Sequence, residues 1–167
     1  MSNIQRPTSS ICFIDTHAHL DSYSEIDKVI EKASKAGVKK IIVVSFDLHC
    51  AKFNQDVVSK YENLFSAVGV HPHNAKDLDK DSREELTKLA KSSKVRAIGE
   101  PGLDFHYLYS EKAQQEEAFR WHIKLANELS LPLIIHSREA TEEVFKILDK
   151  EGWSKDGLVF HAFSGNF

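Results

Sequence analysis

Leu133-Ile134-Ile135-His136-Ser137-Arg138 is the stretch of this 167-residue chain that most clearly indicates its fold. A short apolar, β-branched run is typical of a buried strand, and here an imidazole and a guanidinium follow it directly. We expect the strand to span Leu131–Ile135, which places His136 at its carboxyl end. Two further apolar runs also end in residues that can bind a metal, His161 and Glu100. Ligand-type side chains at the ends of successive strands are therefore the main pattern of the chain.

Short apolar runs and helical patterns alternate in both directions from this stretch. The expected strands are Ile11–Ile14, Val38–Ser45, Leu64–Val70, Val95–Gly99, Leu131–Ile135 and Leu158–Phe160. The expected helices are about Glu25–Ala36, Leu48–Tyr61, a segment capped by Asp81 or Ser82, Glu111–Leu129 and Thr141–Lys150. Helical crossovers between consecutive strands predict a parallel sheet, because each crossover returns the chain to the same end of the sheet.

A parallel sheet of this kind is either open and doubly wound or closed into a barrel, and the polar residues favour the barrel. An open sheet gathers its ligands at one switch point, whereas here polar residues follow strands along the whole chain. We therefore expect an α/β fold of the TIM-type (β/α) barrel class, with parallel strands and outer helices. The sequence contains no linker, which predicts a single domain.

Composition limits the partners and the compartment. The net charge of −3 provides no general basic field, so a polyanion must be held at a local site. Two cysteines, Cys12 and Cys50, favour a reducing compartment over a disulfide framework. The polar stretch Met1–Ser10 lacks the apolar segment of a secretory signal, and every apolar run is too short to span a bilayer. We expect a soluble cytoplasmic protein, or a nuclear one in a eukaryote, with no membrane partner; the oligomeric state stays open.

His17 and His19 follow the first expected strand with one alanine between them. Side chains alternate faces in an extended chain, so both imidazoles point the same way and can bind one metal ion. Taken alone, the pair fits equally well two histidines with ordinary hydrogen bonds. Asp15 shares their face and can orient one of the rings by a hydrogen bond.

Glu100 ends the fourth expected strand, where its two carboxylate oxygens can bridge two cations. Taken alone, a helix-capping or solvent-facing glutamate is the better explanation of this residue. The loop expected over Pro101–Tyr109 carries aromatic side chains, which either stack on nucleic-acid bases or pack over the top of the barrel.

Arg138 directly follows the strand-end pattern of the opening stretch. Its planar fork suits a phosphate or a carboxylate of the substrate, and a salt bridge to Glu139 or Glu142 is the alternative.

His71 and His73 follow the third expected strand, and we expect them to contact substrate rather than metal. His122 lies in the middle of the longest expected helix, and we expect it at the surface or in an interface.

Metal binding is better supported by the candidate ligands taken together than by any one of them. The candidates are His17, His19, Glu100, His136 and His161. Five such residues on strand ends at one face of a barrel are improbable as independent accidents. Mixed imidazole and carboxylate ligation suits Zn²⁺, Mn²⁺ or iron, and a carboxylate-bridged pair can also hold Mg²⁺. Two ions about 3.5–4 Å apart can activate a water and stabilise the leaving oxygen of a phosphodiester, and ester or amide hydrolysis can use the same centre.

The chain resembles the TatD family of metal-dependent deoxyribonucleases, which are amidohydrolase-like TIM barrels. Five motifs carry the resemblance, in the family's order and over nearly the whole chain: Ile14–Asp21, Val68–His73, Ile98–Glu100 with Gly102–Asp104, Ile135–Ala140, and Phe160–Gly165. The resemblance implies a deoxyribonuclease that depends on divalent metal, usually Mg²⁺, and often acts 3′ to 5′ on single-stranded DNA. It also implies that His17 and His19 bind one ion, that Glu100 is the catalytic bridge, and that His136 and His161 bind the second ion. The nucleophile implied in this way is a metal-activated water.

Two features depart from the family pattern. Pro101 stands after Glu100, where the family more often has an aliphatic residue. The family barrel has eight βα units and takes another ligand, an aspartate, from its last strand, whereas this chain ends at Phe167 after about six units. We therefore expect residues 1–167 to be a single, C-terminally incomplete barrel domain, with low activity and stability in isolation.

Three functions compete at this point. The motif set favours a metal-dependent nuclease. A hydrolase of a small ester or amide has the same fold and metal centre, because neither fixes the substrate. A truncated, inactive binding module is the third, and it predicts binding of nucleic acid or protein without metal-dependent turnover.

Overall fold

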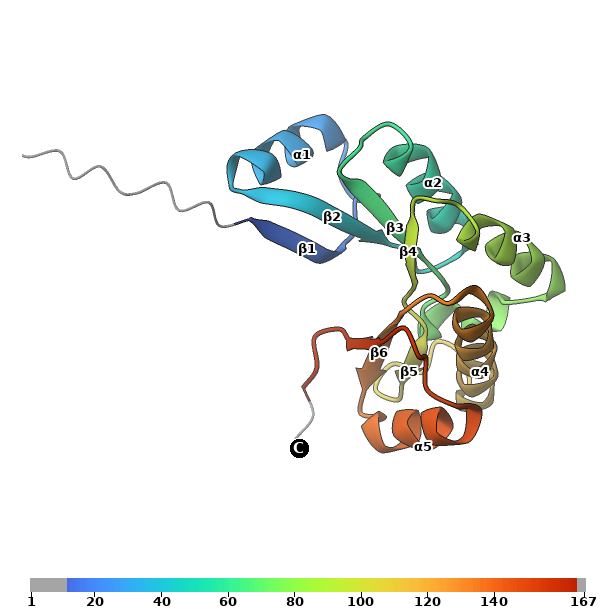
Figure 1. Cartoon of the computed structure of the whole chain (residues 1–167). Coiled ribbons are helices and arrows are strands. Elements are labelled where there is room, and N and C mark those ends of the chain that lie inside the picture. The colour runs from blue at the N-terminus through green and yellow to red at the C-terminus, as the bar shows by residue number, and fades with distance from the viewer. Residues whose placement is uncertain (1–11, 165–167) are drawn as a thin grey trace, which may run out of the picture.

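The computed structural model describes residues 12–164, in which parallel strands and helices alternate (Figure 1). The strands are β1 (Phe13–Ala18), β2 (Val38–Val44), β3 (Leu64–Val68), β4 (Val95–Ile98), β5 (Gly102–Asp104), β6 (Leu133–Arg138) and β7 (Leu158–Phe160). The helices are α1 (Ile26–Lys35), α2 (Leu48–Val58), the 3₁₀ helix η1 (Pro72–Asp77), α3 (Lys80–Ala90), α4 (Lys112–Leu129) and α5 (Thr141–Glu151). Every strand pair is parallel, as the alternation predicts. The expected start of the first strand, Ile11, lies outside the described residues.

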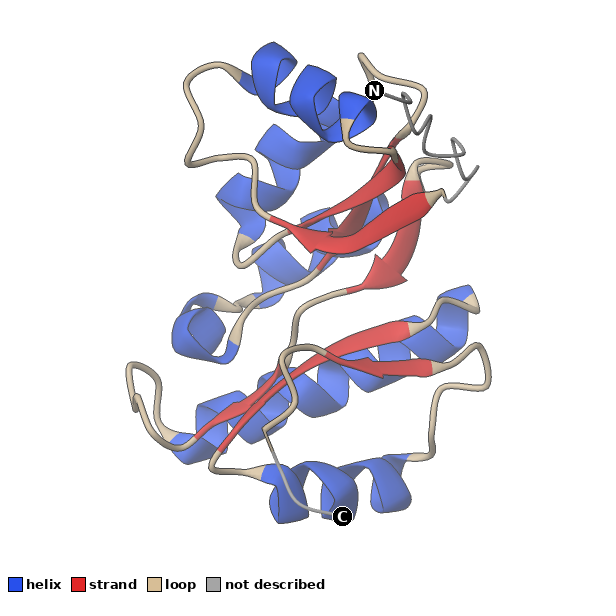
Figure 2. Cartoon of the chain, turned by 90° about the vertical axis from the view of Figure 1, so that its left-hand side faces the viewer, coloured by secondary structure: helices blue, strands red, loops and turns tan. Residues whose placement is uncertain are grey.

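The strands form a curved wall in the order β1-β2-β3-β4-β6-β7, with helices along its outer side (Figure 2). Among the described strands, β1 pairs only with β2, and β7 only with β6. The two edges nevertheless approach each other at their carboxyl ends, where the rings of His17 and His161 stack with centroids 3.4 Å apart. In a flat sheet the two edge strands would be separated by five spacings of about 4.8 Å, or about 24 Å. The wall is therefore curved like part of a barrel.

The fourth position of the wall consists of two short strands, β4 and β5, which pair with β6 one after the other. Ile98 lies opposite Leu133, and Gly102 lies opposite His136. The chain advances four residues from Ile98 to Gly102, while β6 advances three from Leu133 to His136. The first segment therefore has one extra residue around Glu100, as in a β-bulge. The interruption sets Glu100 apart from the regular ladder at the carboxyl end of the wall.

The structure corrects several expected bounds. Two strands end later than expected, β1 at Ala18 and β6 at Arg138, so that His17 and His136 lie within strands. Two further corrections concern β5 and the cap of α3. The loop expected over Pro101–Tyr109 begins with β5, which the sequence hides because a three-residue strand without β-branched side chains gives almost no signal. The cap of α3 is Asp79, whose carboxylate accepts a hydrogen bond from the backbone N–H of Ser82, and not Asp81 or Ser82. Capping residues stand close together here, so the sequence alone does not select among them.

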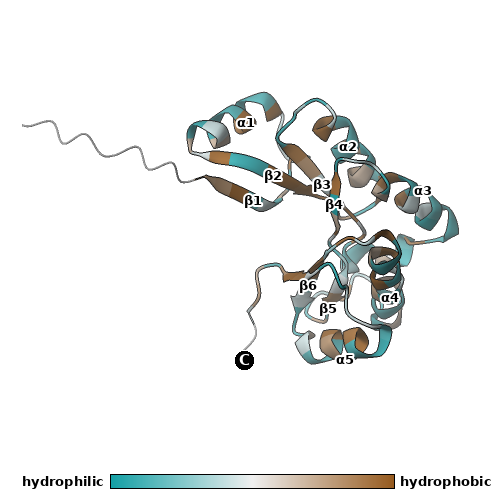
Figure 3. Ribbon diagram, viewed as in Figure 1, coloured by the Kyte–Doolittle hydropathy of each residue, from teal (hydrophilic) through white to brown (hydrophobic). Residues whose placement is uncertain are grey.

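Apolar side chains fill the space between the wall and the helices, and Figure 3 shows hydrophobic stretches along the strands together with a hydrophilic segment in β2. The larger core is built around α4, where Phe119 and Ile123 are fully buried. A smaller core lies against α1 and α2 and includes Leu20, Ile41 and Val58. None of the helices in residues 12–164 has the length and apolar character needed to cross a membrane.

His122 of α4 is fully buried, so the expectation that it lies at the surface or in an interface is wrong. Its Nδ1 lies 2.7 Å from the carbonyl oxygen of Ala118, to which it donates, and its Nε2 accepts from the backbone N–H of Val70 at 3.0 Å. Burial lowers the pKa of His122 to about 4, which keeps the ring neutral. A helix carbonyl and an unpaired strand-end N–H supply both partners, and no sequence pattern reveals such an arrangement.

Candidate metal centre

Side chains from five positions of the wall converge at the carboxyl ends of the strands. His17 comes from β1, His71 from the turn after β3, Glu100 from between β4 and β5, His136 from β6, and His161 from the residue after β7. The carboxyl ends of parallel strands lie on one side of a wall, which is why residues far apart in sequence meet here. The structure thus brings the five residues predicted as ligands, and His71 with them, to one site.

Glu100 lies at the centre of the site and is only 5% exposed. Its Oε2 is 2.9 Å from Nε2 of His17, and its Oε1 is 3.6 Å from Nε2 of His71. Burial acts to raise the pKa of Glu100, but contact with His17 and the charges of His17, His71 and His136 outweigh it and hold the pKa below its usual range. Glu100 is therefore a buried, ionised carboxylate with imidazoles on both sides.

His17 and His19 point the same way, as their spacing predicts, with their Nε2 atoms 3.2 Å apart. Two nitrogen ligands held about 2.1 Å from one tetrahedral or octahedral ion are themselves separated by about 3.0–3.4 Å. His161 joins this side of the site, because ligand atoms of His17, Glu100 and His161 all lie within 4.8 Å of one another. Burial and then the charge of His17 lower the pKa of His161. The neutral ring that results is the form that ligates a metal.

His71 and His136 form a second group with Glu100, whose ligand atoms again lie within 4.8 Å of one another. Nε2 of His71 is 3.1 Å from Nδ1 of His136. Burial, followed by the charge of His136, lowers the pKa of His71 to about 3, so this ring is also neutral. The sequence assigns His71 to substrate contact, whereas its position makes it a candidate ligand as well. The grouping also differs from the one that the resemblance implies, because His161 lies with His17 rather than with His136.

Three buried polar atoms of the site have no hydrogen-bond partner within residues 12–164. They are Nδ1 of His17, Nδ1 of His19 and Oε2 of Glu100. Although Oε2 lies 2.9 Å from His17, that contact lacks hydrogen-bond geometry, and a buried carboxylate oxygen without a donor is costly. A divalent cation removes that cost by accepting lone pairs from the carboxylate and the imidazoles at once. The residues therefore fit a divalent metal centre in which Glu100 is shared by two groups.

Asp104 of β5 is a candidate functional residue that the sequence analysis did not single out. Its Oδ2 lies 3.0 Å from Nε2 of His136 and 2.9 Å from Nε2 of His73. Burial acts to raise the pKa of Asp104, but the backbone N–H of Tyr107 and the two imidazoles lower it, so the group is ionised. With Nε2–H of His136 donated to this carboxylate, the lone pair of Nδ1 is left facing His71. The signals in the sequence were the acidic residue at the end of a short segment after Glu100 and the place of Gly102–Asp104 among the motifs that carry the family resemblance.

Asp15 does not make the contact that the sequence predicts. Its carboxylate accepts a hydrogen bond from the backbone N–H of His17 at 3.0 Å and is not bonded to an imidazole. The predicted shared face assumes regular alternation, whereas the pairing of β1 with β2 is irregular between Asp15 and Ala18.

Arg138 makes neither of the ion pairs that were its alternative explanation within the described part of the chain. Glu139 instead pairs with His106 at 2.7 Å, and the Arg138 guanidinium lies 4.7 Å from the ring centre of Tyr107. Arg138 also lines a cavity of about 450 Å³ that reaches Glu100. Its donors are therefore available to an anion at the site.

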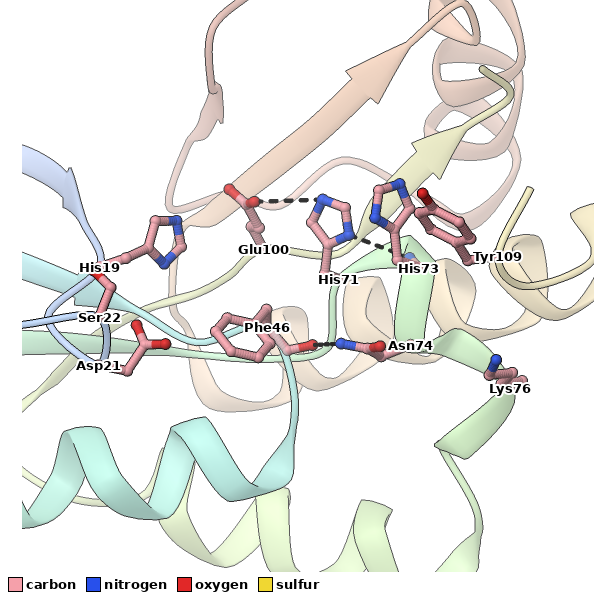
Figure 4. Close-up of a pocket in the computed structure, with 10 residues that line it drawn as sticks. All are labelled: His19, Asp21, Ser22, Phe46, His71, His73, Asn74, Lys76, Glu100 and Tyr109. Atoms are coloured by element: carbon pink, nitrogen blue, oxygen red, sulfur yellow. Dashed lines mark hydrogen bonds and ion pairs between the residues drawn. The ribbon is translucent and has the colours of Figure 1, made fainter. Parts of the chain in front are cut away.

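A second cavity, of about 690 Å³, opens on the other side of Glu100 (Figure 4). It is lined by His19, Asp21, Ser22, Phe46, His71, His73, Asn74, Lys76, Glu100 and Tyr109. Glu100 and His71 line both cavities, so the buried carboxylate can be reached from two directions. His73 lines the larger cavity, and its Nε2 contacts the carboxylate of Asp104.

The chain is similar in sequence to known proteins. The family model described as TatD related DNase matches residues 14–167. An uncharacterized metal-dependent hydrolase, YabD of Bacillus subtilis, is 40% identical over 155 residues, which cover 91% of this chain and 61% of the relative. The 3′-5′ ssDNA/RNA exonuclease TatD of Salmonella typhimurium is 34% identical over 140 residues, covering 84% of this chain and 54% of the relative.

The fold has a counterpart among solved structures. The crystal structure of YJJV, a TatD homologue from Escherichia coli K12, superposes with a TM-score of 0.82 at 31% identity, covering 92% of this chain and 61% of that one. This match confirms the predicted α/β barrel class. The chain spans about three fifths of the length of YabD and of YJJV. The family match extends over nearly the whole chain, and the chain belongs to the family of TatD-related DNases.

Proposed function

We propose that this chain carries the active site of a metal-dependent nuclease that cleaves phosphodiester bonds of single-stranded DNA from the 3′ end. The observation that carries the proposal is the buried Glu100, which is shared by two groups of potential ligands and has an oxygen without a donor among residues 12–164. The name of the Salmonella relative, a 3′-5′ ssDNA/RNA exonuclease, supports the choice of substrate and direction. YabD, which is more similar, is named only as a metal-dependent hydrolase, so the substrate belongs to the proposal.

The proposed cofactor is a pair of divalent ions, held by His17, His19 and His161 on one side of Glu100 and by His71 and His136 on the other. Mg²⁺ is the ion that the family resemblance implies, and the imidazole-rich set of ligands also suits Mn²⁺ or Zn²⁺. When bound, two such ions act as Lewis acids towards a phosphate oxygen and lower the pKa of a water.

The residues of the chain have distinct tasks in this proposal. Glu100 would hold both ions through its carboxylate and lower their positive charge, while Asp104 keeps the proton of His136 on Nε2 and its lone pair on Nδ1. Arg138, which lines the smaller cavity, binds a non-bridging phosphate oxygen through its fork. The neutral ring of His71 needs no deprotonation before it binds a metal near pH 7. A cytoplasmic location stays a prediction of the same account.

The proposal is tested by incubating the chain with a single-stranded oligonucleotide labelled at either end, in the presence of Mg²⁺ or Mn²⁺. We expect stepwise release of mononucleotides from the 3′ end, and a loss of at least about a hundredfold in Glu100→Gln, since metal ions contribute several kcal/mol to such a reaction. Glu128→Gln, an exposed change on α4, is the matched control and should retain full activity. Wild-type activity in Glu100→Gln, or cleavage that persists in excess EDTA, would contradict the proposal.

A further inference from the structure

The larger cavity extends beyond the ligand groups, and we propose that its far end binds one nucleotide of the single strand, with the base on Tyr109 and the phosphate at Lys76. The inference rests on the proposed nuclease function and extends it, because it names the part of the substrate that lies next to the reacting phosphate. It assigns a role to residues that neither group of candidate ligands includes.

The shape of the cavity leaves room for such a group. The cavity runs from His19 and Asp21 at one end to Tyr109 and Lys76 at the other, and Glu100 lies along it (Figure 4). Its volume of about 690 Å³ falls within the range of about 300–1,000 Å³ that is typical of small-molecule sites. The candidate ligands His19, His71 and Glu100 line only a part of this cavity. The end that is lined by Tyr109 and Lys76 is left for the neighbouring nucleotide.

Tyr109 has the properties of a stacking platform. Its side chain is 61% exposed, and the ring of Tyr107 lies parallel to it, with an interplanar angle of 2° and centroids 5.7 Å apart. The guanidinium of Arg138 lies over Tyr107 in turn, and the ring of His73 meets Tyr109 at nearly a right angle, with centroids 4.8 Å apart. Tyr109 is thus braced by its neighbours while more than half of its surface stays open. Exposed, well-held aromatic rings bind bases by stacking, with little dependence on sequence.

Lys76 supplies the positive charge at this end of the cavity. It is exposed on η1 and makes no ion pair with any residue from 12 to 164. Its backbone N–H donates to Oγ of Ser110, whose hydroxyl donates to the carbonyl of His73, so the segment of Lys76 is tied to the loop of Tyr109. Asp21, the exposed acid of the cavity wall, lies at the opposite end (Figure 4). In a chain of net charge −3, an uncompensated ammonium beside an open aromatic ring matches a phosphate beside a base.

This subsite selects single strands. A base in a duplex is paired and stacked on both sides, so it must leave the helix before it can lie on Tyr109, and unstacking costs free energy. A base in a single strand is already free to stack on a protein ring.

The test is a binding measurement that needs no turnover. A fluorescent hexathymidylate and an abasic hexamer with the same sugar–phosphate backbone are titrated into the Glu100→Gln chain by fluorescence anisotropy, with Tyr109→Ala, Tyr109→Phe or Lys76→Gln added. We expect Tyr109→Ala to weaken binding of hexathymidylate about tenfold and that of the abasic hexamer less than twofold, with Tyr109→Phe unchanged. Lys76→Gln should reduce the slope of log Kd against log salt by about 0.7 for both oligomers.

Lys60→Gln is the matched control for charge, because Lys60 is exposed after α2, at the opposite end of the wall, and its removal should leave the slope unchanged. Equal weakening of both oligomers by Tyr109→Ala, or no weakening of either, would overturn the inference, as would an unchanged slope in Lys76→Gln with an unaltered melting temperature. The proposed function is judged separately by metal-dependent hydrolysis of bis(4-nitrophenyl) phosphate by the wild-type chain, since that substrate carries no base. Hydrolysis of this substrate by the wild-type chain, together with no effect of Tyr109→Ala on hexathymidylate binding, would therefore reject the subsite alone.

Discussion

His122 connects the long helix α4 to the strand end that carries His71. Its Nε2 holds the backbone N–H of Val70, one residue before His71, while its Nδ1–H is fixed by Ala118 in the preceding turn of α4. A buried N–H without a partner costs about 1–3 kcal/mol, so this ring stabilises the backbone from which His71 projects. Because an imidazolium cannot accept the Val70 hydrogen bond, the arrangement requires the neutral ring.

The buried His122 makes stability depend on pH in a predictable direction. Its pKa is about 4 in the folded chain and about 6.5 when unfolded, so the unfolded state binds more protons between these values. The free energy of unfolding contributed by this ring is fully present above pH 6.5 and is lost as the pH falls towards 4. Between pH 7 and pH 4.5 we expect the free energy of unfolding of the wild-type chain, measured with urea, to fall by about 2–3 kcal/mol more than that of His122→Gln. Gln can make both hydrogen bonds without titrating, and parallel pH profiles of the two chains would contradict this role.

At the scale of elements, the short strand β5 is held in place from two sides. On one side it pairs with β6, and on the other Gln115 of α4 bonds both the N–H and the carbonyl of Asp104, at 2.8 and 3.1 Å. The bonds from Gln115 stand in for the hydrogen bonds of a second neighbouring strand, which stabilise the short strand β5. They fix Asp104, and through it the ring of His136.

Gly102 is required for this arrangement. Its φ is +152°, and a Cβ on it would lie 1.9 Å from the backbone oxygen of His136. That oxygen cannot move away without breaking the pairing of β5 with β6. We expect Gly102→Ala to lower the free energy of unfolding by about 3–5 kcal/mol. Gly152→Ala is the control, since its φ is +88° but no atom of the described part of the chain lies within 4 Å of the added Cβ, and it should cost only about 1–2 kcal/mol. Urea midpoints that shift equally in the two variants would show that the close contact does not matter.

The elements themselves were predictable where their patterns are long. The five α-helices and six of the described strands follow apolar periodicity, and the structure has them within a few residues of the expected bounds. β5 was not predictable, because Gly102 and Asp104 are both rare in strands and the segment depends on Gln115, a residue in another element. The cap of α3 was missed for a local reason, since Asp79 and Asp81 are equally good caps until the backbone is known.

At the scale of the whole molecule, curvature creates the site. His17 and His161 belong to opposite edges of the wall, and they meet only because the wall bends around Glu100. The sequence predicts this meeting, since parallel strands present their carboxyl ends together. It cannot predict which imidazoles share a group, because that depends on the bulge around Glu100 and on the ring orientations that Asp104 fixes. The role of His71 as a candidate ligand, and that of Asp104, emerge only at this scale.

The shared carboxylate is the centre of this account, and the number of metal ions bound by the chain tests it most directly. Mn²⁺ binding is measured by equilibrium dialysis with elemental analysis, for the wild-type chain and for Glu100→Gln, with thermal melting as a check on folding. We predict two ions for the wild-type chain, at most one weakly held ion for Glu100→Gln, and a rise in melting temperature on adding Mn²⁺ to the wild-type chain alone. Equal stoichiometry in the two chains, or no bound ion in a folded wild-type chain, would contradict the account.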